Sequence, residues 1–299
     1  MKKDKRVNGF IGLGLMGTPM TKRLLAKGYE VHIWNRSADK MQPLVAAGAQ
    51  SRSSITELAK LVDVIMLCVS DSAAVEAVVR GSDAENGSLL AGLRKEQVVV
   101  DFSSIAPDVT RDLAADVAQH QSHWVDCPVS GGVAGAEAGT LAMMAGGEAG
   151  VIDWLRPLLA CLSQRVTHVG GSGSGQVTKI CNQMLVSCNV LVMAEVMALA
   201  EKAGVDASRI PEALAGGFAD SLPLQLTGPR MAASDFDEVK WHVKTLLKDL
   251  DMANVLGKQL GSSIPMAGLG AELMRLHGGL GNLEKDPATL VSMYREKEA

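Results

Sequence analysis

The chain has 299 residues, enough for one large domain or two of ordinary size. Apolar residues make up 47% of it, so a sizeable core can form, and the formal net charge is -4, from 29 basic and 33 acidic residues. This acidic balance, together with only 3% aromatic residues, argues against a nucleic-acid-binding surface, which needs a basic excess and stacking side chains.

Short β-rich segments alternate with segments of helical period through the first half of the chain. This alternation predicts βαβ units and a parallel sheet, and the near-continuous Val, Ile and Leu runs are typical of strands covered on both faces. The predicted strands are Val7–Leu13, Glu30–Trp34, Val64–Val69, Val98–Phe102, Trp124–Cys127, Leu141–Ala145 and Val166–Val169. The predicted helices are Thr18–Lys27, Ala38–Ala47, Ser72–Val79, Pro107–His120 and Val151–Leu162.

The pattern changes at the glycine–serine stretch of residues 170–175. This stretch predicts a junction between a first domain of residues 1–171 and a second of residues 172–299. After it the strand patterns stop, and apolar residues follow helical spacing. A helix from about Gly175 to Lys202, ended by Gly204, is about 40 Å long at ~1.5 Å per residue, so it can run from one domain into the other. Prolines divide the remainder into further helices, so we expect an all-helical second domain.

Residues 9–17 read GFIGLGLMG, a Gly-x-Gly-x-x-Gly turn between a predicted strand and a predicted helix. Gly12 allows the tight turn, Gly14 lets the backbone approach a pyrophosphate, and Gly17 lets the helix pack on the strand. The following helix N-terminus attracts anions. A plain glycine turn is the alternative in a chain with 31 glycines, but the strand–turn–helix context favours a dinucleotide-binding Rossmann domain. The predicted contacts are Gly12, Leu13, Gly14, Leu15, Met16 and Gly17.

The second predicted strand ends in Asn35, Arg36 and Ser37. An acidic residue at this place would bind the ribose 2′-hydroxyl of NAD, and the chain has none there. Arg36 can instead meet the 2′-phosphate of NADP, with Asn35 and Ser37 as hydrogen-bond donors. The alternative is a surface arginine without such a role. We therefore expect NADP, with NAD as the other candidate.

Ligands of an open α/β sheet bind at the carboxyl ends of its strands. We therefore assign Cys68, Val69 and Ser104 to the cofactor site, although a serine–proline helix cap also explains Ser104. Ser130 is followed by Gly131 and Gly132, and consecutive amides there can hold a small carboxylate. An ordinary flexible loop is the alternative for that segment.

Lys179 lies near the start of the long predicted helix, with Asn182 one turn later and Gln183 beside it. A lysine on an apolar helix is exposed, paired or catalytic, and a cofactor that carries hydride needs a group that carries a proton. We therefore predict that Lys179 is that group, oriented by an amide. The segment Trp241–Asp251 is also rich in charge, and we interpret most of those charges as a solvated helix face.

The five cysteines contain no C-x-x-C pair, and the six histidines show no metal-ligand spacing. Cys68, Cys127 and Cys181 lie in apolar runs, so we expect buried, reduced thiols, no metal and a cytoplasmic protein. The stretch Leu185–Ala200 is interrupted by polar residues and is short for a membrane span. The basic start, residues 1–6, is not followed by the apolar segment of a signal peptide.

Five ordered motifs resemble those of the β-hydroxyacid dehydrogenase family across nearly the whole chain. They are GFIGLGLMGTPM, DFSSIAP, DCPVSGGVAGAEAGTLAMMAGG, GSGQVTKICNQ and LLKDLDMA. That family includes 3-hydroxyisobutyrate dehydrogenase and the tartronate semialdehyde and glyoxylate/succinic semialdehyde reductases. The resemblance implies a Rossmann domain joined by the long helix to an all-helical domain used for substrate binding and oligomerisation.

The resemblance also implies roles for single residues. Lys179 becomes the general acid/base, and Ser130, Gly131 and Gly132 hold the substrate carboxylate. Lys248 lies toward the nicotinamide. Some members carry asparagine where this chain has Gln183, so either Asn182 or Gln183 supplies the catalytic amide. Many members carry phenylalanine where Trp241 stands, which leaves the shape of the substrate pocket open.

These observations predict an NADP(H)-dependent oxidoreductase that interconverts a small 3-hydroxy acid and its semialdehyde. The implied partners are a small carboxylate and a second copy of the chain, in a homodimer or homotetramer, with no nucleic acid or membrane. One alternative is an imine-reductase-like enzyme, although that branch generally lacks a lysine in the context of Lys179. Another is a non-catalytic NADP-binding module.

Overall fold

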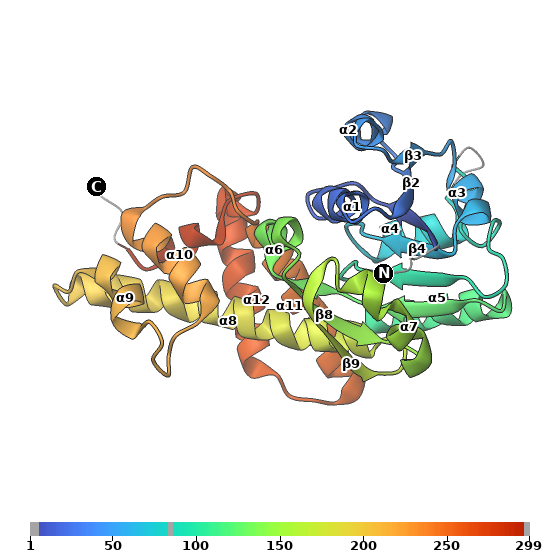
Figure 1. Ribbon diagram of the computed structural model, residues 1–299. Coiled ribbons are helices and arrows are strands. Elements are labelled where there is room, and N and C mark those ends of the chain that lie inside the picture. Colours follow the sequence, from blue (N-terminus) through green and yellow to red (C-terminus); the bar gives the residue numbers. More distant parts are fainter. Residues whose placement is uncertain (1–5, 83–85, 296–299) are drawn as a thin grey trace. The chain divides into compact units, whose positions relative to one another are not determined.

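The computed structural model describes residues 6–82 and 86–295, so most of the basic start lies outside the described residues. The chain forms two compact units, Met1–Lys179 and Ile180–Ala299. Helix α8 (Ser174–Lys202) is continuous and contributes residues to both of them (Figure 1). The first unit is α/β and the second is helical, as the sequence predicts.

The first unit is built on one sheet in the order β3-β2-β1-β4-β5-β6-β8-β7, with β9 paired to β8. The strands are β1 (Val7–Ile11), β2 (Glu30–Trp34), β3 (Gln50–Ser51), β4 (Val64–Leu67), β5 (Val98–Asp101), β6 (His123–Asp126), β7 (Val129–Ser130), β8 (Leu141–Gly146) and β9 (Ser163–Gly170). Strands β3 through β6 are parallel, whereas β8 runs antiparallel to β6 and β7. The sheet is therefore parallel over the predicted dinucleotide-binding part and mixed beyond it.

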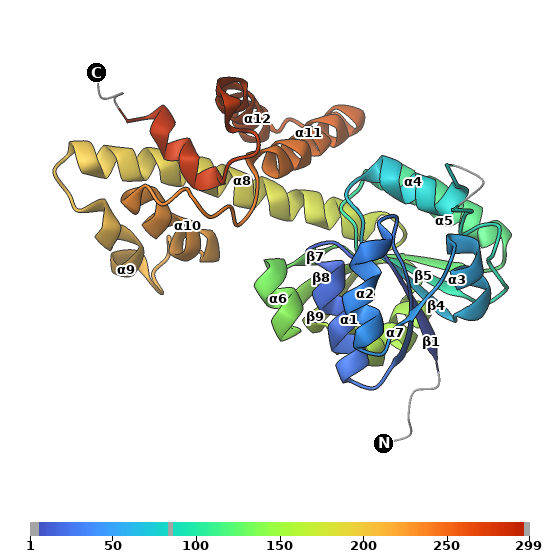
Figure 2. The same ribbon diagram turned by 90° about the horizontal axis from the view of Figure 1, so that it is seen from above.

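Helices cover both faces of this sheet (Figure 2). They are α1 (Gly17–Ala26), α2 (Gln42–Ala46), α3 (Ile55–Leu61), α4 (Ser72–Arg80), α5 (Pro107–Gln119), α6 (Gly132–Ala138) and α7 (Ala149–Leu159). Neighbouring residues of one strand enter different cores: Phe10 belongs to one buried cluster and Ile11 to another. Burial on both faces explains why the strands read as continuous apolar runs.

Several short elements differ from the sequence prediction. The predicted helix Ala38–Ala47 is divided into a 3-10 turn η1 (Ala38–Met41) and α2, where Pro43 stands in the first turn. Strands β3 and β7 have two residues each, and α6 consists mainly of small residues, so none of them produces an apolar period. Helix α3 is also absent from the prediction.

The second unit contains α9 (Ile210–Leu214), α10 (Leu222–Ala233), α11 (Val243–Leu260) and α12 (Pro265–His277) beside most of α8. Short turns η2 (Ala207–Arg209), η3 (Gly278–Asn282) and η4 (Pro287–Met293) complete it, and residues 180–295 contain no strand. Its core is a separate cluster that includes Val190, Leu250 and Met274. By length and composition alone α8 could cross a membrane, although the core helix of a water-soluble protein meets the same criterion.

Candidate active site

The fold requires glycine at two of the three motif positions, and the third faces open space. Gly12 has a φ of +95°, and a Cβ there would lie 2.3 Å from the carbonyl oxygen of Cys68. A Cβ on Gly17 would lie 1.9 Å from the carbonyl oxygen of Gly12. A Cβ on Gly14 would meet nothing within 4 Å, so the backbone faces open space at the position predicted to approach a phosphate. The arrangement fits the predicted pyrophosphate turn.

The start of α1 also fits an anion. Its N-cap, Met16, makes no side-chain capping bond, and the first turn contains no acidic residue. The N–H groups of a first helical turn and the positive end of the helix dipole favour negative charge at such a place. Leu13 is buried and Leu15 is exposed, so these two predicted contacts differ in what they can offer a ligand.

Asn35 has a structural role that the sequence does not predict. Its Oδ1 accepts a hydrogen bond from the Leu13 backbone N–H at 2.9 Å, and its Nδ2 donates to the Ser37 carbonyl at 2.9 Å. Asn35 therefore ties the glycine turn to the end of β2. Arg36 and Ser37 are exposed beside it.

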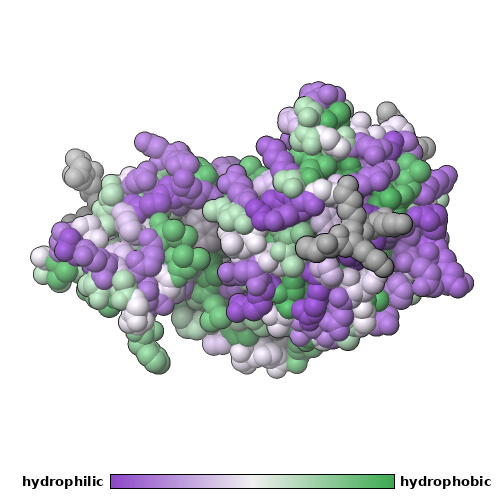
Figure 3. Space-filling model, in the orientation of Figure 1, coloured by the Kyte–Doolittle hydropathy of each residue, from purple (hydrophilic) through white to green (hydrophobic). Residues whose placement is uncertain are grey.

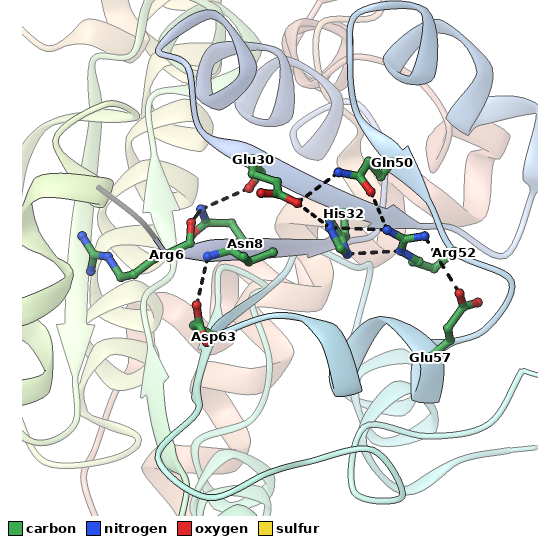
Figure 4. Close-up of polar contacts among 9 residues, drawn as sticks. Arg6, Asn8, Glu30, His32, Gln50, Arg52, Glu57 and Asp63 are labelled. Carbon is green, nitrogen blue, oxygen red and sulfur yellow. Dashed lines mark hydrogen bonds and ion pairs between the residues drawn. The ribbon is translucent and has the colours of Figure 1, made fainter. Parts of the chain in front are cut away.

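A polar cluster lies along the paired strands β2 and β3 (Figure 4). Arg52 donates to His32 Nδ1 at 3.1 Å and to Gln50 at 2.6 Å, and its guanidinium lies 4.0 Å from Glu57. Burial lowers the pKa of His32, which favours the neutral imidazole that accepts this bond. Arg52 is therefore committed to the cluster, whereas the side chain of Arg36 is exposed.

Ser103 joins the loops that follow β4 and β5. Its Oγ accepts from the Val69 N–H at 3.0 Å, and its own N–H donates to Asp101 at 2.9 Å. Burial, with a smaller effect of Asp101, raises the pKa of the Cys68 thiol to about 12, so Cys68 presents a neutral thiol. Ser104 is partly buried, and the N-cap position of α5 is Ala106. Pro107 stands in the first turn of α5, as the serine–proline cap predicts, and the role of Ser104 toward the cofactor stays a prediction.

Ser130, Gly131 and Gly132 form a strand–helix junction rather than a free loop. Ser130 ends β7, Gly131 is the N-cap of α6 with a φ of +135°, and Gly132 begins the helix. A Cβ on Gly132 would meet nothing within 4 Å. The backbone is therefore fixed by the fold and open on one side, which suits a small anion.

Lys179 is half-buried on α8. The first turn of this helix is held by Asp126, whose carboxylate accepts from the N–H groups of Gly173 at 2.8 Å and Gln176 at 3.0 Å. Sequence reasoning missed Asp126 and Gln176. The available signal was an acidic residue inside an apolar run at the end of a strand.

In the second unit, Asn182 and Gln183 form one hydrogen-bonded chain with Asp249. Asn182 Nδ2 donates to Gln183 Oε1 at 2.9 Å, and Gln183 Nε2 donates to Asp249 at 2.5 Å. Lys248 Nζ lies 3.3 Å from the other carboxylate oxygen. An ionised carboxylate only accepts, so it fixes which end of the Gln183 amide faces it.

The structure corrects the predictions for Asp249 and Cys181, and two others remain open. Asp249 is 2% exposed, so the interpretation of its segment as a mainly solvated face is wrong for this residue. Cys181, expected to be buried, is exposed.

Trp241 packs against the core of the second unit. The roles of Trp241 toward substrate and of Lys248 toward the cofactor stay predictions. No group of three metal-ligating side chains occurs among the described residues.

Comparison with known proteins identifies the family. The NAD-binding domain model of 6-phosphogluconate dehydrogenase matches residues 8–170. The NAD-binding model of NADP-dependent 3-hydroxyisobutyrate dehydrogenase matches residues 173–294. The chain belongs to the β-hydroxyacid dehydrogenase family. It is therefore an oxidoreductase with a nicotinamide cofactor.

Individual relatives of this family are similar over almost their full length. The 2-hydroxy-3-oxopropionate reductase of Escherichia coli K12 is 37% identical, over 95% of each chain. Psf3, solved in complex with NADP+ and 2-OPP, is 30% identical with a TM-score of 0.85, over 97% of this chain and 100% of its own. The 3-hydroxyisobutyrate dehydrogenase of Mycobacterium tuberculosis, solved with L-serine, is 26% identical with a TM-score of 0.87, over 97% and 99%.

Proposed function

We propose that this enzyme interconverts a small 3-hydroxy acid and its semialdehyde with NADP(H), and that Lys179 transfers the proton. The observation that carries the proposal is that one unit contains both an open glycine turn and a half-buried lysine on α8. The names of the family relatives, 2-hydroxy-3-oxopropionate reductase and 3-hydroxyisobutyrate dehydrogenase, support the substrate class.

The mechanism assigns one task to each group. The nicotinamide, when bound, supplies or accepts hydride at the substrate carbon. Lys179 donates a proton to the carbonyl oxygen during reduction and removes it during oxidation, and such acid–base help is typically worth about 10²- to 10⁴-fold in rate. The amide of Asn182 or of Gln183, about one turn along the same helix, orients the ammonium. The N–H groups around Gly131 and Gly132 hold the carboxylate.

The preference for NADP is attributed to Arg36. The guanidinium is exposed at the end of β2 and has no acidic neighbour at positions 34–38. A charged hydrogen bond to the 2′-phosphate is worth about 1.5–3 kcal/mol, or roughly 10- to 150-fold in affinity. We therefore expect kcat/KM to favour NADPH over NADH by about that factor. Arg36→Asp is expected to reverse the preference, and equal use of both cofactors in the wild type would remove this assignment.

The activity is tested with a substrate panel and one variant. Tartronate semialdehyde, succinic semialdehyde, glyoxylate and methylmalonate semialdehyde are each assayed with NADPH and with NADH. Lys179→Ala is expected to lower kcat by at least ~10² while cofactor affinity persists. Turnover of cyclic imines instead of the panel would favour the imine-reductase alternative. Tight NADPH binding without turnover would favour the non-catalytic module.

We also propose that the enzyme is a homo-oligomer that works in the cytoplasm. Helix α8 exposes Leu185 (76%), Val192 (48%) and Leu199 (70%) at intervals of seven residues, the repeat by which like helices pack together. Leu185 and Val192 line an apolar groove of about 530 Å³ that also includes Leu214 and Met266. Figure 3 shows apolar surface on the second unit, on the face of the molecule that this view presents. A second copy of the chain is the occupant that this helical repeat favours.

A further inference from the structure

Helix α8 begins inside a buried polar network rather than at an ordinary capped end. The Asp126 carboxylate is fully buried and accepts from two N–H groups at the start of the helix, those of Gly173 and Gln176. The backbone between them is tightly packed, because a Cβ on Gly175 would lie 2.4 Å from the Met144 carbonyl oxygen. The start of the helix therefore has very little freedom to shift.

Gln176 makes a second attachment through its side chain. Its Nε2 donates to the Ser103 carbonyl at 2.8 Å, and its Oε1 accepts from the Ile105 N–H at 3.1 Å. Gln176 is 1% exposed, so water does not compete for either bond. The amide thus satisfies one carbonyl and one N–H of the loop after β5 at the same time, and both ends of it are used.

This attachment connects two parts of the proposed site. The loop after β5 contains Ser104 and is tied through Ser103 to Val69 in the loop after β4. Lys179 follows Gln176 by three residues on the same helix, so the two side chains lie about one turn apart. One buried amide therefore connects the helix that carries Lys179 to the loops of the proposed cofactor site.

We propose that Gln176 is a positioning residue that holds Lys179 in register with the cofactor loops, with Asp126 fixing the backbone on which it acts. The inference rests on the proposed proton transfer by Lys179. A purely stabilising role predicts that any substitution lowers stability and that the folded fraction works normally. Positioning predicts that the folded enzyme itself loses kcat when the hydrogen bonds of the Gln176 side chain are removed.

Gln176→Glu separates the two roles because the side chain keeps its size and its amide is replaced by a titratable carboxyl group. The protonated carboxyl of this variant can still donate to the Ser103 carbonyl and accept from the Ile105 N–H, whereas its ionised form presents two acceptors to a carbonyl. Burial and the neighbouring carboxyls of Asp126 and Asp101 favour the protonated form at mildly acidic pH. At pH 5.5 we expect kcat within about 3-fold of wild type, and at pH 8 a loss of about 10-fold or more.

Gln97→Glu is a matched control in the same unit. Gln97 is 2% exposed, and its Nε2 donates to the carbonyls of Ala59 and Val62, at the other end of β5. It carries the same change and the same burial without a connection to α8. At temperatures below both unfolding midpoints we expect its kcat relative to wild type to stay constant with pH. Gln176→Leu is expected to lose kcat at both pH values.

A second measurement does not depend on turnover. The rate of Lys179 acetylation by acetic anhydride, followed by peptide mass spectrometry from pH 5.5 to 9, reports the surroundings of the amine. We expect Gln176→Glu to depart from the wild-type profile only at high pH and Gln97→Glu to follow it throughout. A kcat ratio for Gln176→Glu that is independent of pH, with an unchanged acetylation profile, would overturn the inference. Absence of turnover by the wild type would overturn the proposed function instead, and the acetylation profile would still decide this one.

Discussion

Two buried carboxylates attach to helix α8, and they use different kinds of partner. In the first unit, Asp126 accepts from the backbone N–H groups of Gly173 and Gln176. In the second unit, Asp249 accepts from the side chain of Gln183 and lies beside the ammonium of Lys248. Backbone donors are present whatever the side chain, whereas side-chain donors can change with one substitution. The carboxylate in the first unit is therefore held by main-chain donors, and the one in the second unit by side-chain donors.

The glycine turn offers the largest test of this comparison. Gly17→Ala places a methyl carbon 1.9 Å from a backbone oxygen. We therefore expect the free energy of unfolding to fall by about 4 kcal/mol or more, or the protein not to fold. Gly14→Ala adds a methyl to open space, so folding is expected to be normal while the Kd for NADPH rises about 10-fold or more. Thermal unfolding and cofactor titration measure the two effects. Equal loss of stability in both variants would contradict the assignment of Gly14 to the ligand.

The two carboxylates can be compared directly by truncation. Asp126→Ala leaves two buried backbone donors without their acceptor, so we expect about 2–5 kcal/mol off the free energy of unfolding. Asp249→Ala leaves one side-chain amide, which can rotate, and a partly exposed lysine, so about 1–3 kcal/mol is expected. Urea unfolding at pH 7 gives both numbers. A larger loss for Asp249→Ala would reverse the proposed difference between the units.

Asp101 adds a pH dependence to the main-chain part of the site. One of its oxygens is buried without a hydrogen-bond partner among the described residues, and burial is the largest cause that raises its pKa to about 7. The folded pKa of Asp101 lies above the unfolded value of about 3.9. The stability that its protonated carboxyl contributes is therefore fully present below the unfolded pKa and is lost as the pH rises through about 7. Asp101→Asn is expected to flatten the fall in unfolding free energy between pH 5 and 8 by a few kcal/mol, on the order of 1.4 per pKa unit. An unchanged slope would show that Asp101 does not titrate in this range.

The exposed side chains of α8 give the smallest expected change in folding energy. Leu185→Glu and Leu199→Glu alter solvent-facing positions, so the unfolding free energy is expected to change by about 0.5 kcal/mol or less. The assembly is expected to dissociate toward a species of 31.4 kDa, because charges replace the apolar repeat. Sedimentation at micromolar concentration tests this. A wild type that sediments only as the monomer would contradict the proposed oligomer.

Local patterns in the sequence predict most of the fold. The glycine turn, the extent of β2 and the start of α5 follow from spacing and from residues with one favoured conformation, such as Gly12 and Pro107. The length of α8 follows from an uninterrupted helical period. The antiparallel β8 does not follow, because strand direction depends on how the chain returns to the sheet.

The supporting residues of the site are beyond local patterns because their partners are distant along the chain. Gln183 and Asp249 are 66 residues apart, and Gln176 and Ser103 are 73 apart. The same acidic residue type in the Trp241–Asp251 segment is partly exposed at one position and buried at another. Only three-dimensional packing distinguishes Asp249 from Asp251.

The contrast among the cysteines has a practical consequence for optical studies. Burial raises the pKa of Cys127 well above its usual range, and Cys68 is held neutral in the same way. Cys181 is exposed on α8, two residues after Lys179. A maleimide dye is therefore expected to attach first at Cys181. The protein can then be labelled there without any substitution, and the dye reports events around that turn of the helix.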